Sequence, residues 1–223
     1  MRVVALADTH LAHGPGYAVP DGDLLIHAGD LCNWGDLAEL ERAVRWLEAL
    51  PHRHKVVIAG NHDRACQLQP QEARALLGGV IYLEDEGVEL AGLRLWGSPW
   101  QPEFFAWAFN LPRGPALAKV WARIPVGLDI LVTHGPPHGT GDRTGWNGDA
   151  HAGCEALRDR LPEVAPRLHL FGHIHEDGGL WRLGRTVVAN VTTAECTRAP
   201  TVIDLDGDEL VPVVVPPSGR RDA

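Results

Sequence analysis

Short apolar runs alternate with polar segments along the first part of the chain. Arg2–Ala7, Leu24–Ala28 and Lys55–Ala59 consist mainly of apolar, β-favouring residues and predict buried strands. Between the last two runs, Asp36–Leu50 carries apolar residues at helical spacing, and Asp36 is the expected N-cap. The order strand, helix, strand predicts a βαβ unit with a parallel sheet.

The rest of the chain predicts further short helices and strands, ending in β-structure. The expected helices are Pro70–Leu77, Ala116–Ala122 and Cys154–Leu161. The expected strands are Val88–Leu90, Leu93–Trp96, Ile130–Thr133, Leu168–Phe171, Leu180–Leu183, Thr186–Ala189, Thr201–Leu205 and Glu209–Val214. This pattern predicts two packed sheets with helices outside, in a single domain over residues 1–217 with a loose tail at 218–223. The aromatic stretch Trp96–Phe109 is expected in the core or at a subunit interface.

Five of the apolar runs are each followed by an island of polar residues. The islands are Asp8-Thr9-His10, Gly29-Asp30, Gly60-Asn61-His62-Asp63, Thr133-His134-Gly135 and Gly172-His173-Ile174-His175. Ligand sites in open α/β sheets lie at the carboxyl ends of the strands, so these side chains are expected to converge.

The residue types in the islands suit divalent metal ions. Carboxylate oxygen and imidazole nitrogen together suit borderline ions such as manganese, iron or zinc. Asp8 and His10 are two residues apart, so in an extended segment both point to the same side, and the same holds for His173 and His175. Asp30 can offer one oxygen to each of two ions. Two such ions can activate a water and stabilise an in-line displacement at phosphorus.

Composition and charge narrow the range of partners. The chain has 223 residues, with 45% hydrophobic and 22% charged residues, which is typical of a globular domain. A net charge of -9 argues against nucleic-acid polymers and anionic membranes. It leaves room for a small phosphorylated substrate, because bound dications reverse the local field. No run is long enough to span a bilayer and no secretory peptide fits before Asp8, so a cytoplasmic protein is expected.

The cysteines and the remaining histidines change this picture little. The four cysteines show no Cys-x-x-Cys spacing, so reduced thiols are expected. His27 and His169 lie inside apolar runs and are expected in the core. His13, His138 and His151 lie in loops rich in glycine and proline, and each is a candidate for the edge of the site.

The five islands, in their order and in their residues, resemble the motifs of the calcineurin-like metallophosphoesterase superfamily. The pattern of that superfamily is Asp-x-His, Gly-Asp, Gly-Asn-His-Asp/Glu, His and Gly-His-x-His. The likeness extends to the branch of metallophosphoesterase-domain proteins first noted in brain. The segments that carry it are His27-Ala28-Gly29-Asp30, Trp107-Ala108-Phe109-Asn110, Thr133-His134-Gly135-Pro136-Pro137 and Phe171-Gly172-His173-Ile174-His175-Glu176.

This resemblance implies a fold, a metal centre and a mechanism. The fold is a four-layered α/β/β/α sandwich. Two divalent ions are implied, with manganese favoured. One is held by Asp8, His10, Asp30 and His175, and the other by Asp30, Asn61, His134 and His173. A hydroxide that bridges the ions attacks phosphorus, while His62 contacts the phosphate together with Asn61 and protonates the leaving oxygen. Asp63 and Glu176 are either supports of this site or solvated acids beside it.

The expected function is a phosphodiesterase for small nucleotides, including cyclic ones. A phosphomonoesterase or protein phosphatase with the same metals is the main alternative. The residues after Asp30, Leu31-Cys32-Asn33-Trp34-Gly35, lack the Asp-Arg of Ser/Thr protein phosphatases, which weighs against a protein substrate. A non-catalytic scaffold on the same fold is the third interpretation, and the presence of His62 with every ligand argues against it. No oligomeric state is predicted.

Overall fold

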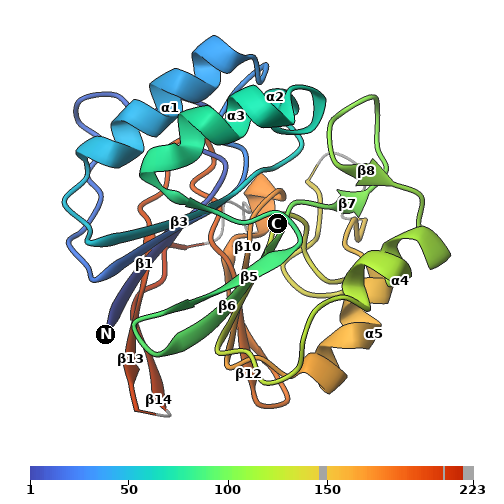
Figure 1. Ribbon diagram of the computed structural model, residues 1–223. Helices are drawn as coiled ribbons and strands as arrows, with labels where there is room; N and C mark the ends of the chain where they lie inside the picture. Colours follow the sequence, from blue (N-terminus) through green and yellow to red (C-terminus); the bar gives the residue numbers. More distant parts are fainter. Residues whose placement is uncertain (146–149, 208, 218–223) are drawn as a thin grey trace.

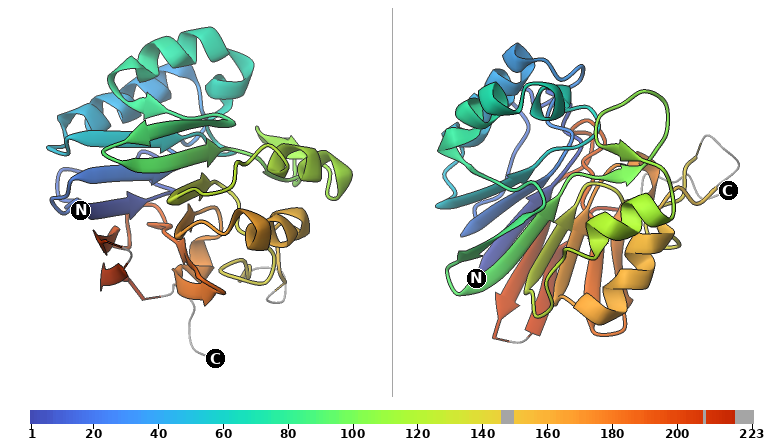
Figure 2. Two further views of the ribbon diagram at one scale, coloured as in Figure 1. Left: turned by 60° about the horizontal axis from the view of Figure 1, so that its bottom comes forward. Right: turned by 45° about the vertical axis from the view of Figure 1, so that its right-hand side comes forward.

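The computed structural model describes residues 1–145, 150–207 and 209–217 of the chain. Two six-stranded sheets lie face to face, and helices cover the outer face of each (Figure 1, Figure 2). Both sheets are mixed, and the expected four-layered α/β/β/α sandwich is confirmed. The tail expected at 218–223 lies outside the described residues.

The first sheet has the strand order β14-β13-β1-β2-β3-β4. Strands β1 to β4 are parallel, β13 is antiparallel to β1, and β14 is antiparallel to β13. The strands are β1 Arg2–Leu6, β2 Leu24–Ala28, β3 His54–Ile58, β4 Ile81–Tyr82, β13 Thr201–Asp206 and β14 Glu209–Val214.

The second sheet has the strand order β11-β12-β10-β9-β6-β5. Its four central strands are parallel, and its two edge strands, β11 and β5, are antiparallel to their neighbours. The strands are β5 Glu86–Leu90, β6 Leu93–Ser98, β9 Ile130–Thr133, β10 Leu168–Phe171, β11 Gly179–Leu183 and β12 Thr186–Asn190. A separate two-stranded ribbon pairs β7 (Gln101–Pro102) with β8 (Asn110–Leu111).

Three helices cover the first sheet and two cover the second (Figure 1). The first group is α1 Leu37–Ala49, α2 Arg64–Leu68 and α3 Pro70–Leu76, and the second is α4 Pro115–Trp121 and α5 Glu155–Val164. Short 3-10 turns, η1 and η2, occupy Leu77–Gly79 and His175–Asp177. Asp36 caps α1 as expected, since its carboxylate accepts a hydrogen bond of 2.8 Å from the backbone N–H of Glu39.

Helix α5 runs past the point where the sequence predicted its end. The expected last residue was Leu161, one residue before Pro162. The helix continues through Pro162 to Val164 and ends at Ala165, whose left-handed backbone lets its N–H bond back to the Leu161 carbonyl.

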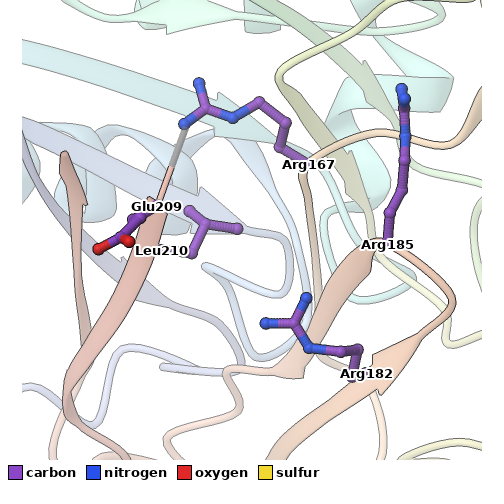
Figure 3. A pocket seen from close by; sticks show the side chains of 5 residues that line it. All are labelled: Arg167, Arg182, Arg185, Glu209 and Leu210. Carbon is purple, nitrogen blue, oxygen red and sulfur yellow. The ribbon is translucent and has the colours of Figure 1, made fainter. Parts of the chain in front are cut away.

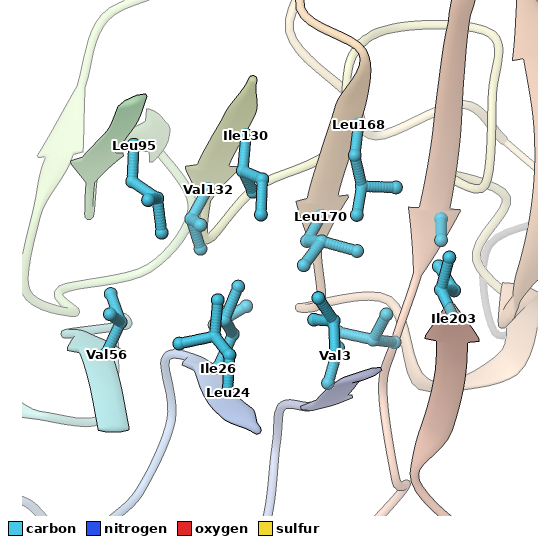
Figure 4. Packing of buried hydrophobic residues seen from close by; sticks show 14 of the residues in the cluster. Val3, Leu24, Ile26, Val56, Leu95, Ile130, Val132, Leu168, Leu170 and Ile203 are labelled. Atoms are coloured by element: carbon cyan, nitrogen blue, oxygen red, sulfur yellow. The ribbon is translucent and has the colours of Figure 1, made fainter. Parts of the chain in front are cut away.

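The central strands are buried on both faces, which explains their unbroken apolar runs. In β1, Val3 and Ala5 pack against the other sheet, whereas Val4 and Leu6 pack under the helices of the first group. Figure 4 shows the side chains of the two sheets meeting in this inner layer. Fully burying one such aliphatic side chain contributes about 1.5–3 kcal/mol. The same layering explains why parallel strands of both sheets end beside one another.

The five polar islands follow β1, β2, β3, β9 and β10, each at a carboxyl end, as the sequence predicted. The four cysteines form no disulfide, and Cys32, Cys66 and Cys154 are buried. Within the described part of the chain, no helix has both the length and the apolar character needed to cross a membrane.

Candidate functional site

The loops that carry the candidate ligands are tightly turned rather than extended. Asp8 and His10 have φ values of 55° and 44°, and Asp30 and His173 have 57° and 71°. His175 begins a 3-10 turn. The expectation that each pair points one way because its segment is extended is therefore wrong. The side chains converge through left-handed backbone, a costly conformation that persists at functional sites when surrounding contacts fix it.

Two glycines make room for these side chains. Gly29 has φ of 95°, and a Cβ on it would lie 2.5 Å from Nδ1 of His134. A Cβ on Gly172 would lie 2.7 Å from Oδ2 of Asp8, although the backbone there has no positive φ. The ligand loops can therefore approach each other only because both positions lack a side chain.

One group of ligand atoms gathers between the loops after β1 and β10. It contains Asp8, His10 and His175, whose ligand atoms all lie within 4.8 Å of one another. Nε2 of His10 lies 3.3 Å from Nε2 of His175 and 3.7 Å from Oδ2 of Asp30. Nδ1 of His10 donates to the Cys32 carbonyl at 2.9 Å, which leaves the Nε2 lone pair of the neutral ring facing the group.

A second group of ligand atoms contains Asp30, His134 and His173, again within 4.8 Å of one another. Nδ1 of His134 donates to the Ala28 carbonyl at 3.0 Å. Its Nε2 then faces Asn61 Oδ1 at 2.8 Å and Asp30 Oδ2 at 3.4 Å, so three electron-pair donors meet. A positive charge between the donors stabilises such an arrangement, whether it is a proton on the ring or a bound cation, and a divalent metal fits the donor set.

The electrostatics of Asp30 and His134 lead to the same requirement. Burial alone would raise the pKa of Asp30, but the imidazoles of His134, His10 and His62 hold it well below its usual range. Burial alone would lower the pKa of His134, but Asp30 outweighs it and raises the value to about 9. A positive charge is thus favoured between these groups, and a bound metal would replace the proton.

His62 stands beside both groups with its ring held on two sides. Nδ1 donates to the Asn33 carbonyl at 2.5 Å, and the ring stacks on Trp107 with centroids 4.1 Å apart. The other ring nitrogen, Nε2, is left free to act in the cavity. A ligand atom of His62 also lies within 4.8 Å of ligand atoms of His10 and Asp30. This geometry fixes the orientation of a group that can exchange a proton in the cavity.

Asp63 is buried and binds backbone rather than solvent. Its carboxylate accepts hydrogen bonds from the N–H groups of Leu31, Cys32 and Gly60 at 2.8–3.3 Å. These donors belong to the loops that carry Asp30 and Asn61. Asp63 therefore ties the second and third islands together from behind.

The ligand groups open into one cavity of about 450 Å³, called the central cavity below. Its other lining residues include Glu103, Phe104, Arg113, His151, Glu176 and Glu195. Phe104 also contacts the ring of His173, with centroids 5.0 Å apart.

Several residues beside this cavity were not predicted from the sequence. The stretch Trp96–Phe109 was expected in the core or at an interface, but Phe104 lines the cavity and Trp107 stacks on His62. The sequence feature that could have indicated their place at the site is the segment Trp107–Asn110, which is part of the family resemblance. Among the loop histidines, His151 lines the cavity, whereas His13 stacks on Trp46.

A larger hollow of about 680 Å³ lies at the opposite edge of the sheets, where Arg167 precedes β10 (Figure 3). Its guanidinium groups are largely engaged by the protein. Arg167 bonds Asp129 and the Gly207 carbonyl, and Arg185 donates to the Ala165 carbonyl at 2.8 and 3.0 Å. The hollow contains none of the candidate ligands, so the chemistry belongs to the central cavity.

Two further histidines are buried directly behind the ligand loops. Nε2 of His27 lies 3.0 Å from Thr9 Oγ1, and Nε2 of His169 lies 2.8 Å from Thr133 Oγ1. In both rings Nδ1 has no hydrogen-bond partner among the described residues. Burial lowers the pKa of each to about 3. Both are therefore neutral core residues.

Acidification is expected to destabilise the protein through these buried rings. His169 has a pKa of about 3 in the folded chain against 6.5 ordinarily, so the unfolded chain binds the extra proton. The contribution of the neutral His169 ring to the free energy of unfolding is complete above pH 6.5 and is lost as the pH falls toward 3. The loss amounts to about 2 kcal/mol between pH 7 and pH 5.

His169→Gln removes the titrating ring and keeps an N–H donor for Thr133. Urea unfolding of both proteins in chelator, at pH 7 and pH 5, measures the effect. The difference in unfolding free energy should shift by about 2 kcal/mol in favour of the variant on acidification. An equal difference at both pH values contradicts the assignment.

Comparison with known proteins gives relatives over most of the chain. The sequence pattern of the family described as calcineurin-like phosphoesterase matches residues 1–177. Metallophosphoesterase domain-containing protein 1 of Homo sapiens is 41% identical over 236 residues, which cover 92% of this chain and 71% of that protein.

Solved structures share the fold at low sequence identity. The protein TT1561 of Thermus thermophilus has a TM-score of 0.65 at 15% identity, covering 98% of this chain and 99% of that one. The phosphopantetheinyl hydrolase PptH of Mycobacterium tuberculosis has a TM-score of 0.56 at 16% identity, covering 85% and 88%. These two likenesses concern the architecture alone.

Proposed function

The chain belongs to the calcineurin-like phosphoesterase family, and from this premise we propose that it is a two-metal phosphodiesterase acting on small nucleotides, cyclic ones included. One observation carries the proposal. The carboxylate of Asp30 belongs to the group with His134 and His173 and lies 3.7 Å from His10 of the other group, and both groups open, beside His62, into a single cavity.

The donor sets divide between two ions. Asp8, His10, Asp30 and His175 would hold one, and Asp30, Asn61, His134 and His173 the other. When bound, two such ions activate the attacking water and neutralise the phosphate oxygens. Manganese suits this mixture of oxygen and nitrogen ligands, as do iron and zinc.

The protein's own groups orient the substrate and supply the proton. Asn61 is held by its 2.8 Å contact with His134, and its amide can also contact a phosphate oxygen. His62 gives a proton to the departing oxygen from the ring nitrogen that does not bond Asn33. Stacking on Trp107 fixes the orientation of the His62 ring. The carboxylate of Asp63 accepts a hydrogen bond from the N–H of Gly60 and so holds the loop that carries His62.

The charge around the central cavity favours diesters over monoesters. Of its lining residues, Glu103, Glu176 and Glu195 are acidic, while Arg113 is the sole lysine or arginine among the described lining residues. Arg113 is already bound to Glu155 and to backbone carbonyls. A diester carries one negative charge and a monoester up to two, so the acidic wall repels a monoester more strongly.

A phosphomonoesterase with the same metals is the second candidate, because two ions can also neutralise a dianion. The two candidates separate in an assay of the manganese-loaded protein. The substrates are bis(p-nitrophenyl) phosphate, p-nitrophenyl phosphate, and 2′,3′- and 3′,5′-cyclic nucleotides. We expect kcat/KM for the diesters to exceed that for the monoester. Faster cleavage of the monoester contradicts the diesterase, and a metal-loaded protein inactive on every substrate contradicts both candidates.

A further inference from the structure

His151 lines the central cavity but belongs to neither group of ligand atoms. It lies in the loop that joins β9 to α5, and its side chain is 35% exposed. The proposed metal centre and His62 leave this imidazole unused. An imidazole that faces a substrate cavity without binding metal is available to bind substrate.

A buried aspartate fixes the orientation of this ring. Nδ1 of His151 lies 2.6 Å from Oδ1 of Asp142, which is fully buried. Oδ2 of Asp142 accepts from the N–H groups of Gly139 and Gly153 at 2.9 and 3.0 Å. Because a carboxylate accepts, Nδ1 carries a proton, and in the imidazole form of the ring the lone pair lies on Nε2.

The backbone that follows His151 is also fixed. Arg113 donates to the carbonyls of Ala152 and Gly153, each at 2.7 Å, and to Glu155 at 2.7 Å. A ring that is held at Nδ1 and followed by a fixed backbone loses little freedom when it meets a ligand, which raises its value for recognition.

The surroundings of His151 determine which ligand group it suits. Glu103 and Glu195 line the same cavity, and Arg113 is engaged as described. The two glutamates would repel a second anionic group on the substrate, whereas a hydroxyl can donate a hydrogen bond to Nε2 of His151. Ordinary alkyl groups would gain nothing from Nε2.

We propose that His151, held by Asp142, accepts a hydrogen bond from a hydroxyl of the ester group next to the phosphate and so selects phosphoesters of polyols or ribosides. This assignment rests on the proposed phosphoesterase function, because it deepens the substrate class of the same cavity. It makes His151 a specificity-determining residue and Asp142 its positioning residue.

The test compares the binding of two ligands that differ only in hydroxyl groups. Glycerol 1-phosphate and propyl phosphate are titrated calorimetrically into the manganese-loaded protein. A net hydrogen bond predicts that glycerol 1-phosphate binds about threefold to tenfold more tightly. His151→Asn keeps an amide N–H for Asp142 and loses Nε2, so it should bring this ratio close to one and leave the affinity for propyl phosphate unchanged.

His138→Asn is the matched control. Its ring lies 5.2 Å from that of His151 but does not line the central cavity, so the ratio should stay at the wild-type value. Equal binding of the two ligands by the wild-type protein overturns the proposal, as does a preference that survives in His151→Asn. An equal loss of both ligands with a lowered Tm in that variant also overturns it, because the pair then only pins the loop.

The binding readout is independent of turnover. A protein that discriminates the two ligands but cleaves no ester retains the role of His151 and loses the proposed function. A protein that cleaves diesters without discriminating loses the role of His151 alone.

Discussion

Asp30→Ala is expected to bind at most one divalent ion per chain and to lose phosphoester turnover by about 10³-fold or more. The carboxylate of Asp30 belongs to the second group of ligand atoms and lies 3.7 Å from His10 of the first, and it is almost fully buried. Its removal would take one proposed ligand from each ion and leave the two positive charges without the negative carboxylate between them.

Metal analysis by mass spectrometry after gel filtration measures this outcome. Asp129→Ala is the control. The carboxylate of Asp129 accepts hydrogen bonds from a backbone N–H and from an arginine, but it lies at the far edge of the sheets, away from the ligand groups. The control should keep two ions and full turnover. Two ions per chain in Asp30→Ala would falsify the shared position of this carboxylate.

His62→Ala is expected to keep both ions and to lose turnover in proportion to the difficulty of expelling the leaving group. General acid catalysis is worth about 10²–10⁴ in rate, and a good leaving group needs little of it. The ring belongs to neither of the proposed donor sets, although one of its nitrogens lies within 4.8 Å of ligand atoms of His10 and Asp30. Metal content and catalysis should therefore separate in this variant.

A series of aryl methyl phosphates with leaving groups of increasing pKa measures the effect as the slope of log kcat against that pKa. The slope should steepen in His62→Ala, with losses near the lower end for p-nitrophenolate and near the upper end for phenolate. Trp107→Leu is an informative companion, because it removes the ring stacked on His62 and keeps the imidazole. An equal loss on every ester in His62→Ala contradicts the acid role.

The sequence predicted the parts of the fold that depend on burial. Strands such as β1 and β2 lie between a second sheet and a layer of helices, so both of their faces must be apolar, and such runs are legible in a single sequence. The five islands were then placed correctly, because a parallel sheet brings carboxyl ends together. Short elements without a periodic pattern, such as α2 (Arg64–Leu68) and β7 (Gln101–Pro102), could not be predicted in this way.

The site was predicted in its residue types more than in its geometry. Alternation along an extended chain was the wrong reason for the pairing of Asp8 with His10, because a left-handed turn after β1 depends on contacts from distant loops. Phe104 lines the cavity and Trp107 stacks on His62 only through tertiary packing, and no local spacing marks either residue. From the sequence, Asp63 could equally be a solvated acid or a residue that supports the site. Its hydrogen bonds to backbone N–H groups of two ligand loops show that it supports those loops.

Diffraction from manganese-soaked crystals, recorded at the manganese absorption edge, tests the central claim most directly. The proposed arrangement predicts two anomalous peaks about 3.5–4 Å apart, with a carboxylate oxygen of Asp30 in contact with each. A single peak, or two peaks of which only one touches Asp30, contradicts it.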